Sequence, residues 1–93
     1  MNQIDLWKET EDALREVVRI HSPTFLNRGR QEDVDSILDL LDHNELGEGF
    51  ECLIALMMDS KVIPNEVTGK LLEESGNRMN IPKDSLELLL EQK

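Results

Sequence analysis

Few side chains in this sequence could carry out chemistry. The chain has two histidines, His21 and His43, and one cysteine, Cys52. A zinc site would need a fourth ligand and short ligand spacing, and the chain shows neither. His43 stands beside Asp42 and Glu45, a setting that would suit a general base. A turn histidine that hydrogen-bonds the backbone at a helix junction accounts for the same residues. We therefore expect no metal, no cofactor and no catalysis.

A serine follows an aspartate twice, as Asp35-Ser36-Ile37 and Asp84-Ser85-Leu86. The second triplet is the one on which acyl carrier proteins bear phosphopantetheine, and those proteins are also small, acidic and helical. They place a glycine just before the triplet and two helices after it. Here Lys83 precedes the second triplet and eight residues follow Ser85, while the first triplet also lacks the glycine. A carrier protein stays an alternative.

The strongest signal in the sequence is its charge. Twenty acidic residues stand against ten basic ones, for a formal net charge of -10 at pH 7. A surface with this excess repels nucleic-acid backbones and anionic lipid, and it attracts basic proteins. We therefore expect a basic protein as partner, and neither a nucleic acid nor a membrane.

The acidic residues also follow a helical pattern. On the first predicted helix they are spaced four, three and four residues apart, at Asp5, Glu9, Asp12 and Glu16. A second series follows the next helix and crosses into the third, at Asp35, Asp39, Asp42, Glu45 and Glu48. Each series lines one side of its helix. Such a stripe is either a solvated face that keeps the protein in solution or a docking surface for a basic protein.

The compartment follows from cysteine use and from missing targeting patterns. No window approaches the roughly 20 apolar residues that a membrane helix needs, and the start MNQIDLWKETED lacks the basic and apolar regions of a secretion signal. Cys52 has no second cysteine to pair with and lies in an apolar run, so we expect a small core residue. We expect a protein of the reducing cytoplasm.

Apolar residues recur at intervals of three and four, which predicts helices. We predict an all-α class: a compact bundle of about five helices with a central third helix, in a single domain of residues 1–93. Ninety-three residues allow only one thin core. The predicted helices run from 4 to about 20, from about 31 to 42, from 44 or 45 to about 58, from 64 to about 79, and from 82 onward.

Four residues set the predicted boundaries. Pro23 ends the first helix, because the residue before a proline avoids the helical region, and His21 to Arg30 then form a loop. Asn44 caps the third helix. Pro64 and Pro82 occupy the first position of the last two helices, where an N–H would have no partner.

The predicted core follows the apolar stripes. On the first helix it contains Ile4, Trp7, Leu14, Val17 and Val18, and on the second Val34, Ile37, Leu38 and Leu41. The third helix has a broad apolar arc of Leu46, Phe50, Leu53, Ile54, Leu56, Met57 and Met58. Val67, Leu71, Leu72, Met79, Leu86, Leu89 and Leu90 pack the last two helices. Gly47 and Gly49 are expected where another helix approaches closely.

The segment from Leu40 to Ile81 resembles the MafI-type immunity proteins and related small helical immunity proteins of bacterial polymorphic toxin and contact-dependent growth inhibition systems. Like them, it has a helix that ends in Leu41-Asp42-His43-Asn44-Glu45-Leu46-Gly47, then an amphipathic helix and the helix start Ile63-Pro64. The closing helix ends in Met79-Asn80-Ile81. The resemblance covers 42 of the 93 residues.

The resemblance implies an inhibitor that binds a cognate toxin domain and occludes its active site. Such toxins are often ribonucleases, including EndoU-like ones, and a ribonuclease surface must be basic to hold RNA. The charge pattern, and not the family, supplies the expected partner-binding residues: Asp35, Asp39, Leu40, Asp42, Glu45 and Glu48. Among them Leu40 would give the interface a dry centre. A helical adaptor for some other basic protein is the second alternative, and the oligomeric state stays open.

Overall fold

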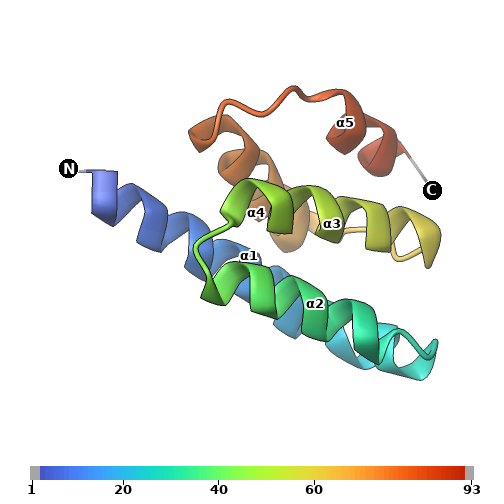
Figure 1. Ribbon diagram of the computed structural model, residues 1–93. Helices are drawn as coiled ribbons and strands as arrows, with labels where there is room; N and C mark the ends of the chain where they lie inside the picture. The colour runs from blue at the N-terminus through green and yellow to red at the C-terminus, as the bar shows by residue number, and fades with distance from the viewer. Residues whose placement is uncertain (1–2, 92–93) are drawn as a thin grey trace.

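The computed structural model describes residues 3–91, with side chains from Leu6 onward. This part of the chain forms five helices and no strand (Figure 1). The helices are α1 (Gln3–Asn27), α2 (Gln31–Asp42), α3 (Leu46–Asp59), α4 (Glu66–Arg78) and α5 (Asp84–Glu91). The all-α class and the five-helix bundle are confirmed. The predicted core position Ile4 and the stripe position Asp5 lie outside the described side chains.

The third helix is central, as predicted. Of the described helices, α3 is the one that packs against all four others, whereas α2 contacts only α1 and α3. Its inward side chains include Phe50, Leu53 and Met57, of which none is more than 2% exposed. Because so many neighbours meet on α3, its apolar arc forms the middle of the shared core.

Four helices end in the same way. A residue with positive φ follows each of α1 to α4, and these residues are Gly29, Asn44, Lys61 and Asn80. After α2, the Asn44 amide donates to the Leu41 carbonyl at 3.1 Å and the Glu45 amide donates to the Leu40 carbonyl at 2.9 Å. This Schellman arrangement satisfies carbonyls that a helix end leaves free. Asn44 therefore closes α2. The prediction that Asn44 caps α3 is wrong, because Glu45 is the residue that directly precedes that helix.

The predicted loop from His21 to Arg30 is wrong over most of its length. α1 continues to Asn27 with Pro23 inside it. Pro23 is exposed, so water can solvate the carbonyl one turn earlier that loses its N–H partner. On the opposite side, His21 and Phe25 are buried, at 8% and 0% exposure. The burial of one residue before and one residue after the proline stabilises the helix, which offsets the cost of the hydrogen bond that Pro23 cannot make.

The two later prolines also stand outside their helices. α4 begins at Glu66, and its cap is Asn65. The Asn65 side chain accepts the Thr68 amide proton at 2.8 Å, while the Asn65 amide donates to the Thr68 hydroxyl at 2.9 Å. This reciprocal pair satisfies two free amides, which a proline at the first position could not do. Pro64 therefore precedes the cap, and Pro82 lies two residues before α5.

Several predicted core positions prove to be exposed. Trp7 is 52% exposed, Val67 60% and Leu90 37%, and Cys52 is also exposed. Cys52 lies on the outer side of α3 because the buried side of the helix is centred on Phe50, Leu53 and Met57, which point in a different direction. The other predicted core residues with described side chains are buried or partly buried.

The two glycines of α3 differ. A Cβ on Gly49 would lie 2.9 Å from Leu41 Cδ2, so α2 does approach closely there. A Cβ on Gly47 would meet nothing within 4 Å, and the expected close approach at that position is wrong. Gly49 thus allows the tight packing of α2 on α3 that sets the angle of the corner between them.

Candidate protein-binding site

We define the acidic corner as Asp39, Asp42, Glu45 and Glu48, at the junction of α2 and α3. The first two lie in the last turn of α2, Glu45 directly precedes α3, and Glu48 lies in its first turn. All four are exposed. The reversed chain between the helices brings them to the same end of the bundle, where α2 and α3 meet (Figure 1).

Asp35 extends the acidic corner along α2. It lies four residues before Asp39, about 6 Å along the helix axis, and on the same side of the helix. Its carboxylate is exposed and accepts a hydrogen bond from Gln31 Nε2 at 2.8 Å. A neutral amide leaves the negative charge of Asp35 in place.

The carboxylates of the acidic corner are poorly neutralised by the chain itself. Among the side chains of residues 6–91, neither Glu45 nor Glu48 has a side-chain hydrogen bond or an ion pair. Asp42 does have one, since its Oδ1 accepts from Arg15 Nη2 at 2.6 Å. That ion pair ties the end of α2 to α1, so Asp42 has a structural role beside any docking role.

His43 lies among these carboxylates and closes α2. Its Nδ1 is 2.8 Å from the Asp39 carbonyl oxygen, which confirms the predicted turn histidine bound to the backbone. This hydrogen bond, with the charges of Asp39, Glu45 and Asp42, raises the pKa of His43 above its usual range. The Asp39 carboxylate is 3.6 Å from Nδ1, so it gains an ionic partner only when His43 is protonated.

The acidic stripe on α1 contrasts with the acidic corner. Each of its described members has an ion-pair partner: Glu9 with Arg78 at 3.7 Å, Asp12 with Lys8 at 3.0 Å, and Glu16 with Arg19. Exposed pairs of this kind add little stability, but they cancel much of the local field. The acidic corner is therefore the less neutralised of the two predicted stripes.

Leu40 is not the exposed apolar residue that the sequence analysis expected at the centre of an interface. It is half-buried, and its Cβ would be 3.8 Å from a Cβ on Gly49, so it packs between α2 and α3. Little of the side chain is available as the dry centre of an interface. The exposed apolar surface at this end of the bundle lies next to the acidic corner instead.

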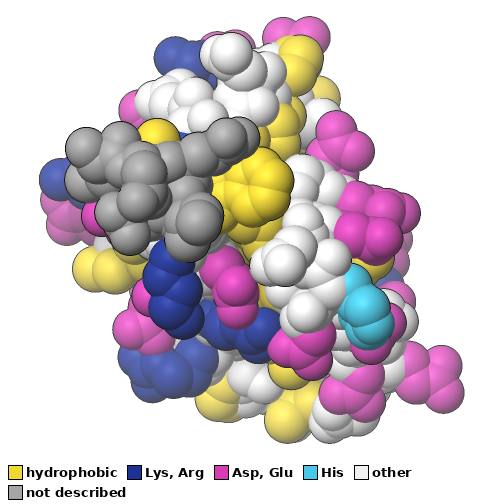
Figure 2. Space-filling view, turned by 60° about the vertical axis from the view of Figure 1, so that its left-hand side comes forward, with side chains coloured by type: hydrophobic (Ala, Val, Ile, Leu, Met, Phe, Trp, Pro, Cys, Tyr) yellow, Lys and Arg dark blue, Asp and Glu magenta, His cyan; other side chains and the backbone are white. Residues whose placement is uncertain are grey.

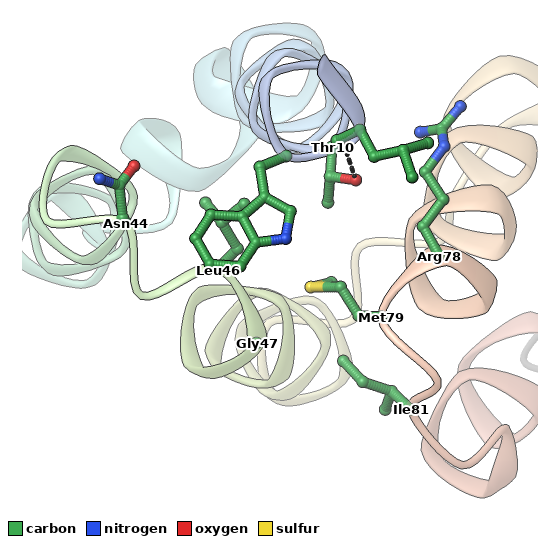
Figure 3. A pocket seen from close by; sticks show the side chains of 9 residues that line it. Thr10, Asn44, Leu46, Gly47, Arg78, Met79 and Ile81 are labelled. Carbon is green, nitrogen blue, oxygen red and sulfur yellow. Dashed lines mark hydrogen bonds between the residues drawn. The ribbon is translucent and has the colours of Figure 1, made fainter. Parts of the chain in front are cut away.

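That surface is a groove of about 480 Å³ between α1, the acidic corner and the end of α4. We call it the Trp7 groove. Its lining comprises Leu6, Trp7, Thr10, Asn44, Leu46, Gly47, Arg78, Met79 and Ile81. Figure 3 shows Asn44 on one side and Arg78 on the other, with Leu46, Met79 and Ile81 between them. Hydrophobic side chains adjoin acidic ones on this face (Figure 2).

The Trp7 groove was missed by the sequence analysis because its parts are far apart in the chain. Trp7, Leu46 and Ile81 come from three separate segments. Trp7 was assigned to the core because it is apolar, and the only usable signal was the lack of an apolar residue one turn after it, at Thr10 and Glu11. The groove and the acidic corner share a border at Asn44 and Gly47.

A buried polar pair was also missed. His21 Nε2 lies 2.9 Å from Thr68 Oγ1 and joins α1 to α4. Burial lowers the pKa of His21. The pair is nearly closed to solvent and joins the packed faces of the two helices.

The remaining candidates lie apart from one another. Ser36 is an exposed residue in the middle of α2, and Ser85 is exposed in the first turn of α5. In the described part of the chain, no three His, Cys, Asp or Glu side chains come together as a metal site would require. None of the described helices is long and apolar enough to cross a bilayer. Neither serine has a histidine hydrogen-bonded to it.

The chain was compared with known protein families, with curated proteins and with solved structures, and no match was found in any of the three.

Proposed function

We propose that this chain is an immunity-type inhibitor that binds a basic toxin domain through the acidic corner and blocks the toxin's active site in the cytoplasm. The observation that supports the proposal most directly is the pairing difference described above. Glu45 and Glu48 are exposed and have no ionic partner among the side chains of residues 6–91, whereas the described α1 carboxylates are paired. Unpaired carboxylates are free to meet lysine and arginine side chains of a partner.

The chemistry of a ribonuclease explains why this surface would inhibit it. An enzyme that holds RNA needs a basic groove to bind the phosphates. A rigid acidic surface can occupy the same electrostatic field and exclude the substrate. No catalytic group is required of the inhibitor, and the proposal assigns it none. The resemblance of residues 40–81 to immunity proteins agrees with this function.

The test neutralises the acidic corner without disturbing the fold. Asp39→Asn, Glu45→Gln and Glu48→Gln are combined, and Asp42 is kept because its ion pair with Arg15 joins two helices. The matched control combines Glu73→Gln, Glu74→Gln and Glu87→Gln on α4 and α5, which do not contact α2. Each variant removes three negative charges, so the two variants have the same net charge.

The partner in this test is the product of the reading frame next to the gene of this chain, expressed in the same cells. We expect the wild-type chain and the control variant to protect the cells and the corner variant to protect them less. Association measured with purified proteins should be slower for the corner variant by about tenfold, and wild-type association should slow as salt is raised. Equal protection and equal association rates for the two variants would refute docking through the acidic corner.

A further inference from the structure

The Trp7 groove has the size and composition of a receptor for a large side chain. Its volume of about 480 Å³ lies within the range of roughly 300–1,000 Å³ found for ligand sites. Met79 and Ile81 are half-buried in its wall, and Leu46 is buried beneath it. This apolar part of the lining is therefore firmly held, because Leu46 belongs to the core and Met79 and Ile81 pack on it.

The exposed aromatic residue of the groove sets it apart from the rest of the surface. The chain has three aromatic residues, one Trp and two Phe. Phe25 and Phe50 are buried in the core, whereas Trp7 is 52% exposed and its neighbour Leu6 is 39% exposed. Tryptophan is among the residues most enriched where a few side chains carry the energy of a protein interface.

The charges around the groove are asymmetric. On one side, Asn44 and Gly47 adjoin Glu45 and Glu48, which have no ionic partner among the described residues. On the other side, Arg78 lies 3.7 Å from Glu9, so its positive charge is offset within the chain. An apolar ligand that enters the groove would thus have unpaired carboxylates next to it.

We propose that the Trp7 groove receives an aliphatic or aromatic side chain that is carried on a basic segment of the partner protein, with lysines or arginines placed against Glu45 and Glu48. This inference rests on the proposed function, because the partner is the same basic protein. A second copy of the chain fits the groove poorly, since it would bring another net charge of -10 to the same surface.

The geometry divides the work of binding between two surfaces. The acidic corner acts at a distance and speeds the encounter, so its loss slows association. The Trp7 groove acts only after contact, when it removes apolar area from water, so its loss speeds dissociation. Variants in the two surfaces should therefore differ in the rate constant that they change.

The test uses two helical peptides of about 14 residues made from lysine and alanine, with a single Phe at the centre of one and a Ser at that position in the other. Both lack tryptophan, so the emission of the full chain comes from Trp7 alone. We expect the Phe peptide to bind about tenfold more tightly by calorimetry and to shift the Trp7 emission to shorter wavelength. Raising the salt concentration should weaken the binding of both peptides.

Matched variants locate the binding. Trp7→Ala should remove the tenfold preference for the Phe peptide, whereas Val67→Ala, at a residue of similar exposure on α4, should preserve it. Equal affinity of the two peptides for the wild-type chain would overturn the proposal. A preference that survives Trp7→Ala would overturn it as well.

Two other occupants are separate outcomes, and each would overturn the proposal. If the chain sediments as a dimer and Trp7→Ala makes it monomeric, a second copy fills the groove. If Ile4→Ser in the full chain raises the affinity for the Phe peptide about tenfold, the chain's own first residues fill it.

Failure of this inference differs from failure of the proposed function. If the toxin is bound and Trp7→Ala leaves its dissociation rate unchanged, only the groove proposal fails. If the wild-type chain still prefers the Phe peptide but binds no toxin and protects no cell, the groove proposal holds and the proposed immunity function fails.

Discussion

Lysine at the end of α3 offers a sharp test of the helix-end geometry. Lys61 has φ of 58°, a left-handed conformation that costs an L-residue with a side chain roughly 1–2 kcal/mol and costs glycine almost nothing. Lys61→Gly should therefore remove this backbone strain. The substitution also makes the unfolded chain more flexible, which lowers the free energy of unfolding by about 0.5–1 kcal/mol. We expect Lys61→Gly to raise the free energy of unfolding by about 0.5–1 kcal/mol.

The matched control is Lys70→Gly, the same substitution at an exposed position inside α4. There the glycine gains nothing from backbone conformation and should lower the free energy of unfolding by about 0.7–1 kcal/mol. Both variants lose one lysine from the same acidic protein, so charge effects largely cancel in the comparison. Because the two changes have opposite signs, the free energies of unfolding of the two variants should differ by about 1–2 kcal/mol.

Urea denaturation followed by far-UV circular dichroism measures both changes, and thermal melting should separate the two variants by roughly 4–8 °C for each kcal/mol. If Lys61→Gly destabilises the protein as much as Lys70→Gly does, then α3 does not end in a left-handed residue. The account of the shared helix-end geometry would then be wrong.

Three further predictions concern single residues. Leu53→Ala, at a wholly buried position, should lower the free energy of unfolding by about 2–5 kcal/mol, whereas Leu88→Ala, at 56% exposure, should change it by less than about 0.5 kcal/mol in the same denaturation experiment. Burial lowers the pKa of His21, so the folded chain binds fewer protons and its stability should fall as the pH drops from above about 6.5 towards the lowered pKa; His21→Gln should flatten this dependence in melts from pH 8 to 5. Cys52 is exposed and should react with a thiol reagent in the folded protein. The reaction should be slower than that of a free thiol, because partial desolvation and the nearby Glu48 raise the pKa of Cys52. A Cys52 that reacts only after unfolding would contradict the exposed placement.

Helix class and the central helix could be predicted because periodicity is a local property of the sequence. The spacing of Leu14, Val17 and Val18 is a helical stripe whatever lies around it. The same stripe continues at His21 and Phe25, so it held a signal that the helix passes through Pro23. The prediction failed because it gave the local proline rule more weight than burial on the opposite side.

The buried side of a residue was harder to predict than the helix itself. α3 is apolar over so much of its circumference that composition does not separate the inner residues from Cys52 and Ala55 on the outside. The Trp7 groove as a whole could not be predicted, because it forms only when α1, the acidic corner and the end of α4 come together. Such placement depends on the packing of all helices, which a single sequence does not specify locally.

The way the chain turns from α2 into α3 has a consequence for how the surface could change over generations. The turn is held by main-chain hydrogen bonds, with Asn44 supplying the left-handed conformation and Gly49 the close approach to Leu41. Glu45 contributes only its main-chain amide to these bonds, a group that any residue except proline supplies. The side chains of Glu45 and Glu48 make none of the described contacts of the turn, so exchanging them leaves the turn intact. A lineage can therefore reverse the charge or reshape the rim of this surface while the bundle stays folded, and recognition of a new partner can evolve without passing through an unfolded ancestor.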